Sequence, residues 1–164
     1  MPVTVIGIDP GSQKTGWGVV REASGVLSLV DCGIIRTSQT ETIFSRRLAL
    51  IFSQLLQILN RLQPEEAAIE DVFVSQNSKT ALKLGQARGV AVACCASKNI
   101  QVSDYPPALV KKALVGTGRA DKEQVAYMVR TFLHIPDAHF SLDTSDALGL
   151  AICHISLRSS PLAY

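Results

Sequence analysis

The stretch VIGIDPGSQKTGWGVV, residues 5–20, decides the fold, because it holds a strand that is apolar on both of its faces. Within residues 3–9, Val5 lies on one face of a two-residue period, and Ile6 and Ile8 lie on the other. Strands of this kind are typical of the centre of a sheet that is covered on both sides. The pattern therefore predicts an α/β protein with this strand at its centre.

Asp9 ends this strand and has two interpretations. Asp-Pro-Gly is good turn chemistry, because Asp bonds to its own backbone, Pro presets φ and Gly accepts a positive φ. The alternative is a functional carboxylate that the strand delivers to a site. Glu70 favours the second interpretation, because it ends the apolar run AAIE in the same way. If the two strands are neighbours in the sheet, the two carboxylates can face each other.

Length and composition limit the class of protein. The chain has 164 residues, of which 47% are hydrophobic, and these numbers predict a single domain over 1–164 with a short tail at 156–164. A net charge of +2 is only mildly basic, so a nucleic-acid partner must be argued from the placement of the cations. No apolar run approaches the ~20 residues that span a bilayer. We expect a cytoplasmic protein without a membrane partner, with its four cysteines reduced.

The rest of the pattern predicts a mixed sheet of about five strands with helices on both faces. Strands at 17–21 and 27–36 follow a turn at Gly11–Gly16 and form a meander with the first strand. A helix over 43–62 carries one apolar stripe, and the strand at 66–71 behind it predicts parallel pairing. The remaining predicted elements are a helix over 78–98 opened by Ser78, a strand at 101–103, a helix from Pro106-Pro107 to Gly116, a helix capped by Asp121 with Gln124, and a helix over 143–157.

Asp143 and Asp146 lie three residues apart at the start of the last predicted helix, so both project from one face. Taken alone, they are interpreted as acids that complement a helix N-terminus. Together with Asp9 and Glu70 they place acids at the ends of three separate apolar elements. Four carboxylates within ~6 Å at an effective dielectric of ~20 repel by ~3 kcal/mol per pair. Bound Mg²⁺ or Mn²⁺ would relieve this repulsion, and two ions ~4 Å apart suit phosphoryl transfer.

Small residues recur at every fourth position of the predicted helix 78–98, at Ala81, Gly85, Gly89 and Ala93. Each of the two glycines costs ~1 kcal/mol relative to alanine inside a helix. Such a loss is tolerable where another backbone packs closely against the flat face. That backbone belongs either to the protein's own sheet or to a second copy of the chain.

Four motifs resemble the RuvC-type Holliday-junction resolvases in order and spacing: GIDPGSQKTGWGV, AIEDVFVSQNSKTALKLGQARGV, GTGRADKEQV and DTSDALGLAICH. The resemblance implies a ribonuclease H-like fold and a homodimer that hydrolyses two symmetric phosphodiesters of a four-way DNA junction with Mg²⁺, leaving 5′-phosphate and 3′-hydroxyl ends. It also implies roles in recombination and repair, a branch-migration motor of the RuvA–RuvB type as partner, and a place at the bacterial nucleoid. The catalytic and metal-binding residues that it implies are Asp9, Glu70, Asp143 and Asp146.

The resemblance also implies contacts with DNA. Phe73 matches an aromatic residue that stacks on an unpaired base, which is worth ~1–3 kcal/mol, although by itself it is interpreted as a strand residue facing the core. Lys111 and Lys122 match lysines near the scissile phosphates and would otherwise be solvated cations. The other cations that could follow the phosphate backbone are Lys79, Lys83, Arg88 and Arg119. The flat helix face is assigned to the dimer interface, and His134, His139 and His154 are expected to be structural.

Two other functions fit parts of the sequence. GIDPGSQKTG also resembles the first phosphate-binding loop of actin-like ATPases, but that fold needs two lobes and a second phosphate loop. A junction-binding scaffold without catalysis would share the fold, but it would not need an acid at all four positions. A thermal shift caused by nucleotide, and cleavage of a four-way junction with Mg²⁺, separate these functions.

Overall fold

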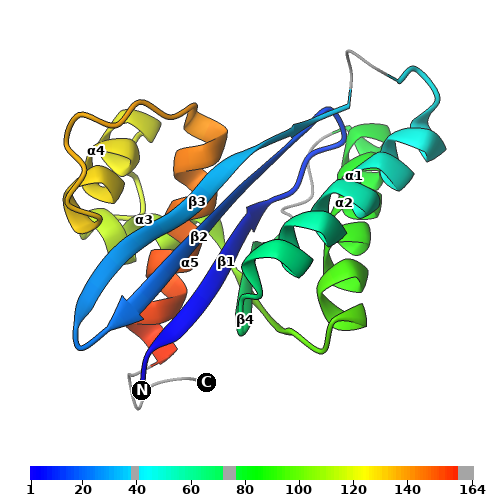
Figure 1. Cartoon of the computed structure of the whole chain (residues 1–164). Helices are drawn as coiled ribbons and strands as arrows, with labels where there is room; N and C mark the ends of the chain where they lie inside the picture. Colours follow the sequence, from blue (N-terminus) through cyan, green and yellow to red (C-terminus); the bar gives the residue numbers. More distant parts are fainter. Residues whose placement is uncertain (38–40, 72–76, 159–164) are drawn as a thin grey trace.

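The structure, a computed structural model, describes residues 1–37, 41–71 and 77–158. One five-stranded sheet in the order β3-β2-β1-β4-β5 forms its centre (Figure 1). The first three strands form an antiparallel meander, and β4 and β5 run parallel to β1. This topology confirms the predicted mixed sheet with the first strand in the middle. The strands are β1 Val3–Asp9, β2 Lys14–Ala23, β3 Val26–Arg36, β4 Glu66–Glu70 and β5 Gln101–Tyr105.

Helices cover both faces of the sheet, with α1 and α2 on one side and α3, α4 and α5 on the other (Figure 1). Because side chains alternate along a strand, β1 supplies both layers. Val5 is buried in the layer of α5, whereas Ile6 and Ile8 are buried in the layer of α1 and α2. The helices are α1 Phe44–Leu62, α2 Ser78–Ser97, α3 Pro107–Val115, α4 Lys122–Phe132 and α5 Leu142–Arg158.

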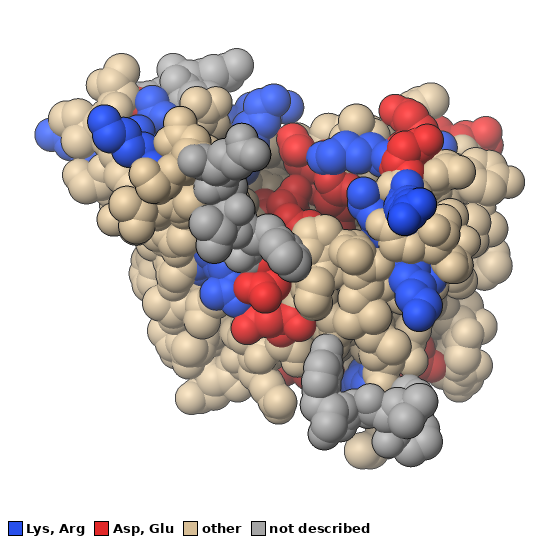
Figure 2. Space-filling model, turned by 180° about the vertical axis from the view of Figure 1, so that it is seen from behind, with Lys and Arg blue, Asp and Glu red and all other residues tan. Residues whose placement is uncertain are grey.

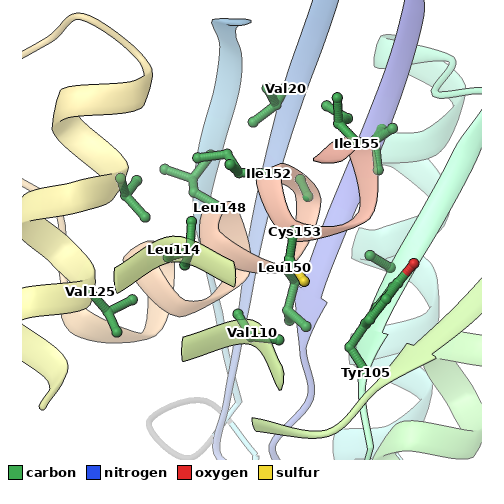
Figure 3. Close-up of a cluster of buried hydrophobic side chains, with 14 of the residues drawn as sticks. Val20, Tyr105, Val110, Leu114, Val125, Leu148, Leu150, Ile152, Cys153 and Ile155 are labelled. Carbon is green, nitrogen blue, oxygen red and sulfur yellow. The ribbon is translucent and has the colours of Figure 1, made fainter. Parts of the chain in front are cut away.

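Helix α5 is the most deeply buried helix, because it lies between the sheet and the pair α3 and α4. Figure 3 shows Leu148 and Ile152 of α5 among Val110, Leu114 and Val125 from these two helices. Each fully buried aliphatic side chain of this kind contributes about 1.5–3 kcal/mol through removal from water. Burial on all sides therefore fixes the helix that carries Asp143 and Asp146.

Gly16 lies inside a strand, contrary to the prediction that it ends a turn. Strand β2 begins at Lys14 and pairs Gly16 with Asp9. The sequence GSQKTG is rich in turn residues, and for this reason the pattern placed the turn too far along the chain. Backbone pairing with Asp9 extends the strand to this position, and the absence of a side chain at Gly16 lets helix α5 lie against it.

The starts and ends of the helices follow local chemistry. Helix α2 begins at Ser78, as predicted, and is capped by Asn77, whose side chain accepts two backbone N–H groups. The capping box of Asp121 and Gln124 at α4 is present as predicted. Gly116 ends α3 with a φ of 88°, which is the left-handed conformation that glycine adopts most readily.

The flat face of α2 does not pack on the sheet. A Cβ atom built at Gly85 or Gly89 would meet nothing within 4 Å, and Ala93 is exposed. Leu82 on the same helix is 68% exposed. Of the two alternatives, packing on the protein's own sheet is therefore excluded at Gly85 and Gly89, and coverage by a second copy stays a prediction.

The cysteines lie where small apolar residues would be expected. Cys94, Cys95 and Cys153 are buried, Cys32 is half-buried, and all four are free thiols. Within 1–37, 41–71 and 77–158, no helix combines the length and the apolar character needed to cross a membrane.

Candidate active site

Two of the predicted acids leave the sheet side by side. Strands β1 and β4 are parallel neighbours that pair Ile8 with Ile69, so Asp9 and Glu70 follow at the same edge. Asp146 approaches from α5, and all three acids line a cavity of about 230 Å³. Figure 2 shows acidic side chains gathered in a hollow that Lys and Arg side chains flank. Of the four acids that the sequence predicts to converge, three line this cavity and Asp143 does not.

Two lysines line the same cavity. Lys122 at the start of α4 donates a hydrogen bond from Nζ to Asp146 Oδ2 at 2.9 Å. Lys111 comes from α3, and apolar residues of α3, α4 and α5 complete the wall. A cavity with acids from three elements and two cations has the chemistry to bind a phosphate group beside divalent ions.

Asp143 does not line the cavity, although its charge acts on Asp9. Its backbone carbonyl lies directly over Gly16 of β2. Ser141 caps the start of α5, because its Oγ accepts the N–H of Thr144 at 3.2 Å. Asp143 lies in the first turn of α5, where its charge also complements the helix dipole, as the capping alternative predicts.

Three glycines allow α5 to lie directly on the sheet. A Cβ atom at Gly7 would stand 1.8 Å from the carbonyl oxygen of Ala147, and one at Gly16 would stand 2.3 Å from that of Asp143. At Gly18 it would stand 2.5 Å from the Leu148 side chain. Any side chain here would push α5 and its aspartates away from Asp9. Sequence reasoning missed this role, although glycines inside a strand often mark a close backbone approach.

The acids are electrostatically strained. Burial raises the pKa of Asp9 to about 8, and the charges of Glu70, Asp146 and Asp143 add to the effect, while Lys122 opposes it. Burial also raises the pKa of Glu70, with Asp146 adding and with Lys122, a hydrogen bond from Asp9 and Lys111 opposing. The hydrogen bond of Asp146 raises the pKa of Lys122. The nearby charges of Lys122 and Lys111 thus oppose the repulsion inferred from the sequence without cancelling it.

The donor set fits a hard divalent cation, although the present arrangement is not a formed metal site. In the part of the chain that the structure describes, no three His, Cys, Asp or Glu side chains stand close enough together to hold an ion as they lie. Asp146 is paired with Lys122, and Asp9 is hydrogen-bonded to Glu70. The donors are all oxygens, and burial together with the charges of the neighbouring acids raises the pKa of Asp9. A cation would compete with the Lys122 ammonium for Asp146.

Arg88 of α2 is bonded to the end of β4. Its Nε donates to the backbone oxygen of Glu70 at 3.3 Å, and its guanidinium pairs with Asp104 of β5. The arginine is half-buried and links α2 to the strand end that carries Glu70. Its predicted contact with DNA stays a prediction, and the sequence did not indicate its internal partners.

The other predicted DNA contacts are placed as follows. Lys79 and Lys83 are exposed on α2, where the Lys83 ammonium stands 5.5 Å from the centre of the Phe44 ring. Arg119 is exposed between α3 and α4. Phe73 lies outside the described residues.

The architecture and the three converging acids define the class of protein. A mixed five-stranded sheet with acids from β1, β4 and α5 is the ribonuclease H-like nuclease fold. The yeast mitochondrial Holliday junction resolvase Ydc2 shares this fold at 13% identity and a TM-score of 0.62, over 91% of this chain and 77% of that one.

The family follows from closer relatives. The model of the family "Crossover junction endodeoxyribonuclease RuvC" matches residues 5–154. RuvC of Nitratidesulfovibrio vulgaris is 60% identical over 95% of this chain and 92% of its own. Thermus thermophilus RuvC, solved in complex with a Holliday junction substrate, has a TM-score of 0.85 at 34% identity over 93% of both chains. The chain belongs to the RuvC family of metal-dependent crossover junction endodeoxyribonucleases.

Proposed function

We propose that the protein resolves four-way DNA junctions by two symmetric, Mg²⁺-dependent phosphodiester hydrolyses that leave 5′-phosphate and 3′-hydroxyl ends. The observation that carries the proposal is the cavity that Asp9, Glu70 and Asp146 line together with two lysines. Membership of the RuvC family supports the substrate, since the Thermus relative was solved with a Holliday junction. The reaction serves recombination and repair, at the nucleoid in the bacterial cytoplasm.

The four acids Asp9, Glu70, Asp143 and Asp146 would hold the metal, with two ions in each site and with Mn²⁺ as a substitute. Bound Mg²⁺ supplies positive charge to the scissile phosphate and lowers the pKa of water. The chain itself orients the phosphodiester so that water attacks in line with the bond from phosphorus to the 3′ oxygen. Lys111 and Lys122 contact the scissile phosphate, and Lys122 becomes available when a cation takes its place at Asp146.

The DNA arms would be held by phosphate contacts and by one stacking residue. Lys79, Lys83 and Arg119 are exposed and can approach phosphates, and such contacts make the affinity fall with salt. Phe73 would stack on an unpaired base at the crossover, and Arg88 would add a phosphate contact beside its internal ones. Binding of this kind recognises the shape of the junction before cleavage.

A homodimer would bring two active sites to the two opposing strands of the junction. We assign the interface to the face of α2 whose members are Ala81, Gly85, Gly89 and Ala93. The open space at Gly85 and Gly89 and the exposed Leu82 support this assignment. A motor of the RuvA–RuvB type would act on the same junction.

Gly85→Leu tests the interface. The bulky side chain blocks close approach of a second helix, so sedimentation should show a monomer at concentrations where the native protein is a dimer. Tyr127→Leu, on the exposed face of α4, is the control for a leucine placed away from α2. A dimer of unchanged strength in Gly85→Leu would contradict the assignment.

Cleavage of a synthetic four-way junction tests the function itself. The native protein with Mg²⁺ should nick two opposing strands, and Asp146→Asn should lose activity at least about a thousandfold, because a metal clamp supplies several kcal/mol to the transition state. Gel shift in EDTA should show that this variant still binds the junction. Binding by the native protein without any cleavage would instead indicate a scaffold.

A further inference from the structure

A buried polar network joins α5 to strands β4 and β5 away from the acids. The Tyr105 hydroxyl lies 2.8 Å from Nδ1 of His154, and Nε2 of His154 lies 2.5 Å from Oε2 of Glu66. Arg158 adds two bonds to the same carboxylate, from Nε at 3.1 Å and from Nη2 at 2.5 Å. Tyr105 and His154 are 6% and 5% exposed. The network therefore connects three elements inside the protein.

The acid of the network fixes the directions of its bonds. Burial alone would raise the pKa of Glu66, but the bonds from His154 and Arg158 outweigh burial and lower it. An ionised carboxylate only accepts hydrogen bonds, so Nε2–H of His154 donates to Glu66. In the neutral imidazole, Nδ1 then accepts the Tyr105 hydroxyl. Each polar atom of His154 thus has one defined partner, and the two partners lie on different strands.

These two anchors stand at opposite ends of the parallel pair. Tyr105 is the residue of β5 that pairs with Glu70, at the end of the sheet where the acids lie. Glu66 begins β4 at the other end. A helix residue bonded to both ends resists movement of α5 along the strands as well as rotation about its own axis.

The first half of α5 needs such a restraint. It lies on Gly7, Gly16 and Gly18, which allow close approach but offer no side chains to interlock with the helix. Asp143 and Asp146 stand in this half. A small slide of the helix would change their distance from Asp9 and Glu70 without opening the apolar core.

We propose that Tyr105 and His154 are positioning residues that hold α5 in register with β4 and thereby set the affinity of the acid cluster for Mg²⁺. The inference rests on the proposed function, since it concerns the same four acids. Residues that orient metal ligands from outside the first set of contacts are known to control metal affinity. Tyr105 and His154 would act in this way through the backbone of a whole helix.

Tyr105→Phe is the sharpest test, because it removes one hydroxyl from a ring that stays in place. Melting of the DNA-free protein is measured against Mg²⁺ concentration, and the concentration for half of the maximal shift should rise about three- to tenfold, below the ~10–100-fold cost of losing a direct partner of a ligand. The dissociation constant for the junction in EDTA should not change. At saturating Mg²⁺ the cleavage rate should return to within about twofold of the native rate, because only metal binding is weakened.

Two matched controls separate positioning from general loss of stability. Ile155→Val removes one buried methyl group from the same helix without touching the network, and Tyr127→Phe makes the same chemical change on the exposed face of α4. Neither should move the Mg²⁺ midpoint. In ¹⁵N-edited spectra, His154 of the native protein should show the Nε2–H tautomer, and its Nδ1 signal should shift in Tyr105→Phe.

The outcomes decide between the two proposals. An Mg²⁺ midpoint in Tyr105→Phe equal to that of the native protein, or a rise matched by Ile155→Val, overturns the positioning role and leaves the proposed function in place. A native protein that shows neither an Mg²⁺-dependent shift nor cleavage overturns both. A rise confined to Tyr105→Phe supports both.

Discussion

Glu66 and Glu70 stand on the same strand, four residues apart and on the same face, yet their environments are opposite. Bonds from His154 and Arg158 lower the pKa of Glu66 against the effect of burial. At Glu70 burial raises the pKa, and the charge of Asp146 adds to it. The difference lies in what α5 presents, which is acid at its start and base at its end.

The comparison shows that charged side chains have internal partners at one end of β4 and lack enough of them at the other. At the Glu66 end every charge of the network has an internal partner. At the Glu70 end, protons and the single ion pair with Lys122 stand in for cations. Ionisable groups with shifted pKa values concentrate at functional sites, because a bound ligand supplies the compensating charge that the protein lacks.

The largest expected effect is that the same Glu→Gln substitution changes the stability of the metal-free protein in opposite directions at Glu70 and at Glu66. Glu70→Gln should abolish junction cleavage and raise the melting temperature in EDTA at pH 8, because it removes one of the repelling acids. Glu66→Gln should lower stability by about 1–3 kcal/mol, because Arg158 loses its charged partner. Calorimetry of both variants measures the two shifts in melting temperature. Shifts in the same direction would contradict the difference between the two environments.

The three strand glycines under α5, which are Gly7, Gly16 and Gly18, should be the next most sensitive feature. Gly16→Ala places a Cβ atom 2.3 Å from the Asp143 carbonyl, so α5 must move and stability should fall by about 1–3 kcal/mol. The Mg²⁺-dependent melting shift should weaken with it. Thr131→Ala, on the exposed face of α4 and away from the sheet, is the control, and its effect should stay within about 0.5 kcal/mol. An unchanged stability in Gly16→Ala would contradict the close approach of α5 to the sheet.

The pH dependence of the metal-free protein should be a smaller effect with a definite sign. In the unfolded chain these acids titrate near pH 4, whereas native Asp9 holds its proton to about 8, so stability should fall as pH rises between these values. Glu66 has a lowered pKa, so its contribution is present above its unfolded pKa and is lost as pH falls through the native one.

Melting scans from pH 3 to pH 9 in EDTA should therefore show a maximum near pH 4, the unfolded pKa of these acids, because the Glu66 contribution is lost below it and the Asp9 contribution is lost above it. Mg²⁺ should flatten the alkaline side, because cations replace the protons at Asp9 and Glu70. A metal-free protein whose melting temperature rises steadily from pH 5 to pH 8 would show that the acids do not repel one another in solution.

The sequence predicted the strands and helices well, because their signals are local. The two apolar faces of β1, the stripe of α1 and the capping box of α4 each depend on neighbouring residues. The turn after Asp9 was placed too long, since Gly16 reads as a turn residue until α5 is known to cover it. The start of α2 at Ser78 was predicted, but its cap Asn77 was not identified, because Asn77 and Ser78 are both good caps.

The candidate site was predicted in part. Asp9, Glu70 and Asp146 could be found, because each ends an apolar element with a charge that the core cannot accept. The bond of Arg88 to the Glu70 carbonyl and the bond of His154 to Tyr105 could not, because their partners lie 18 and 49 residues away. No periodicity encodes such pairs.

By itself the sequence determined which segments are strands and helices, that β1 is central, and which acids are candidates for binding a cation. Only the tertiary structure decided that Glu66 is satisfied and Glu70 is not, that Asp143 stands outside the cavity, and that one face of α2 is left uncovered. The physical reason is range. Backbone preference and apolar periodicity act over a few residues, whereas the pKa of a carboxylate depends on which distant side chains the packing of α5 brings beside it.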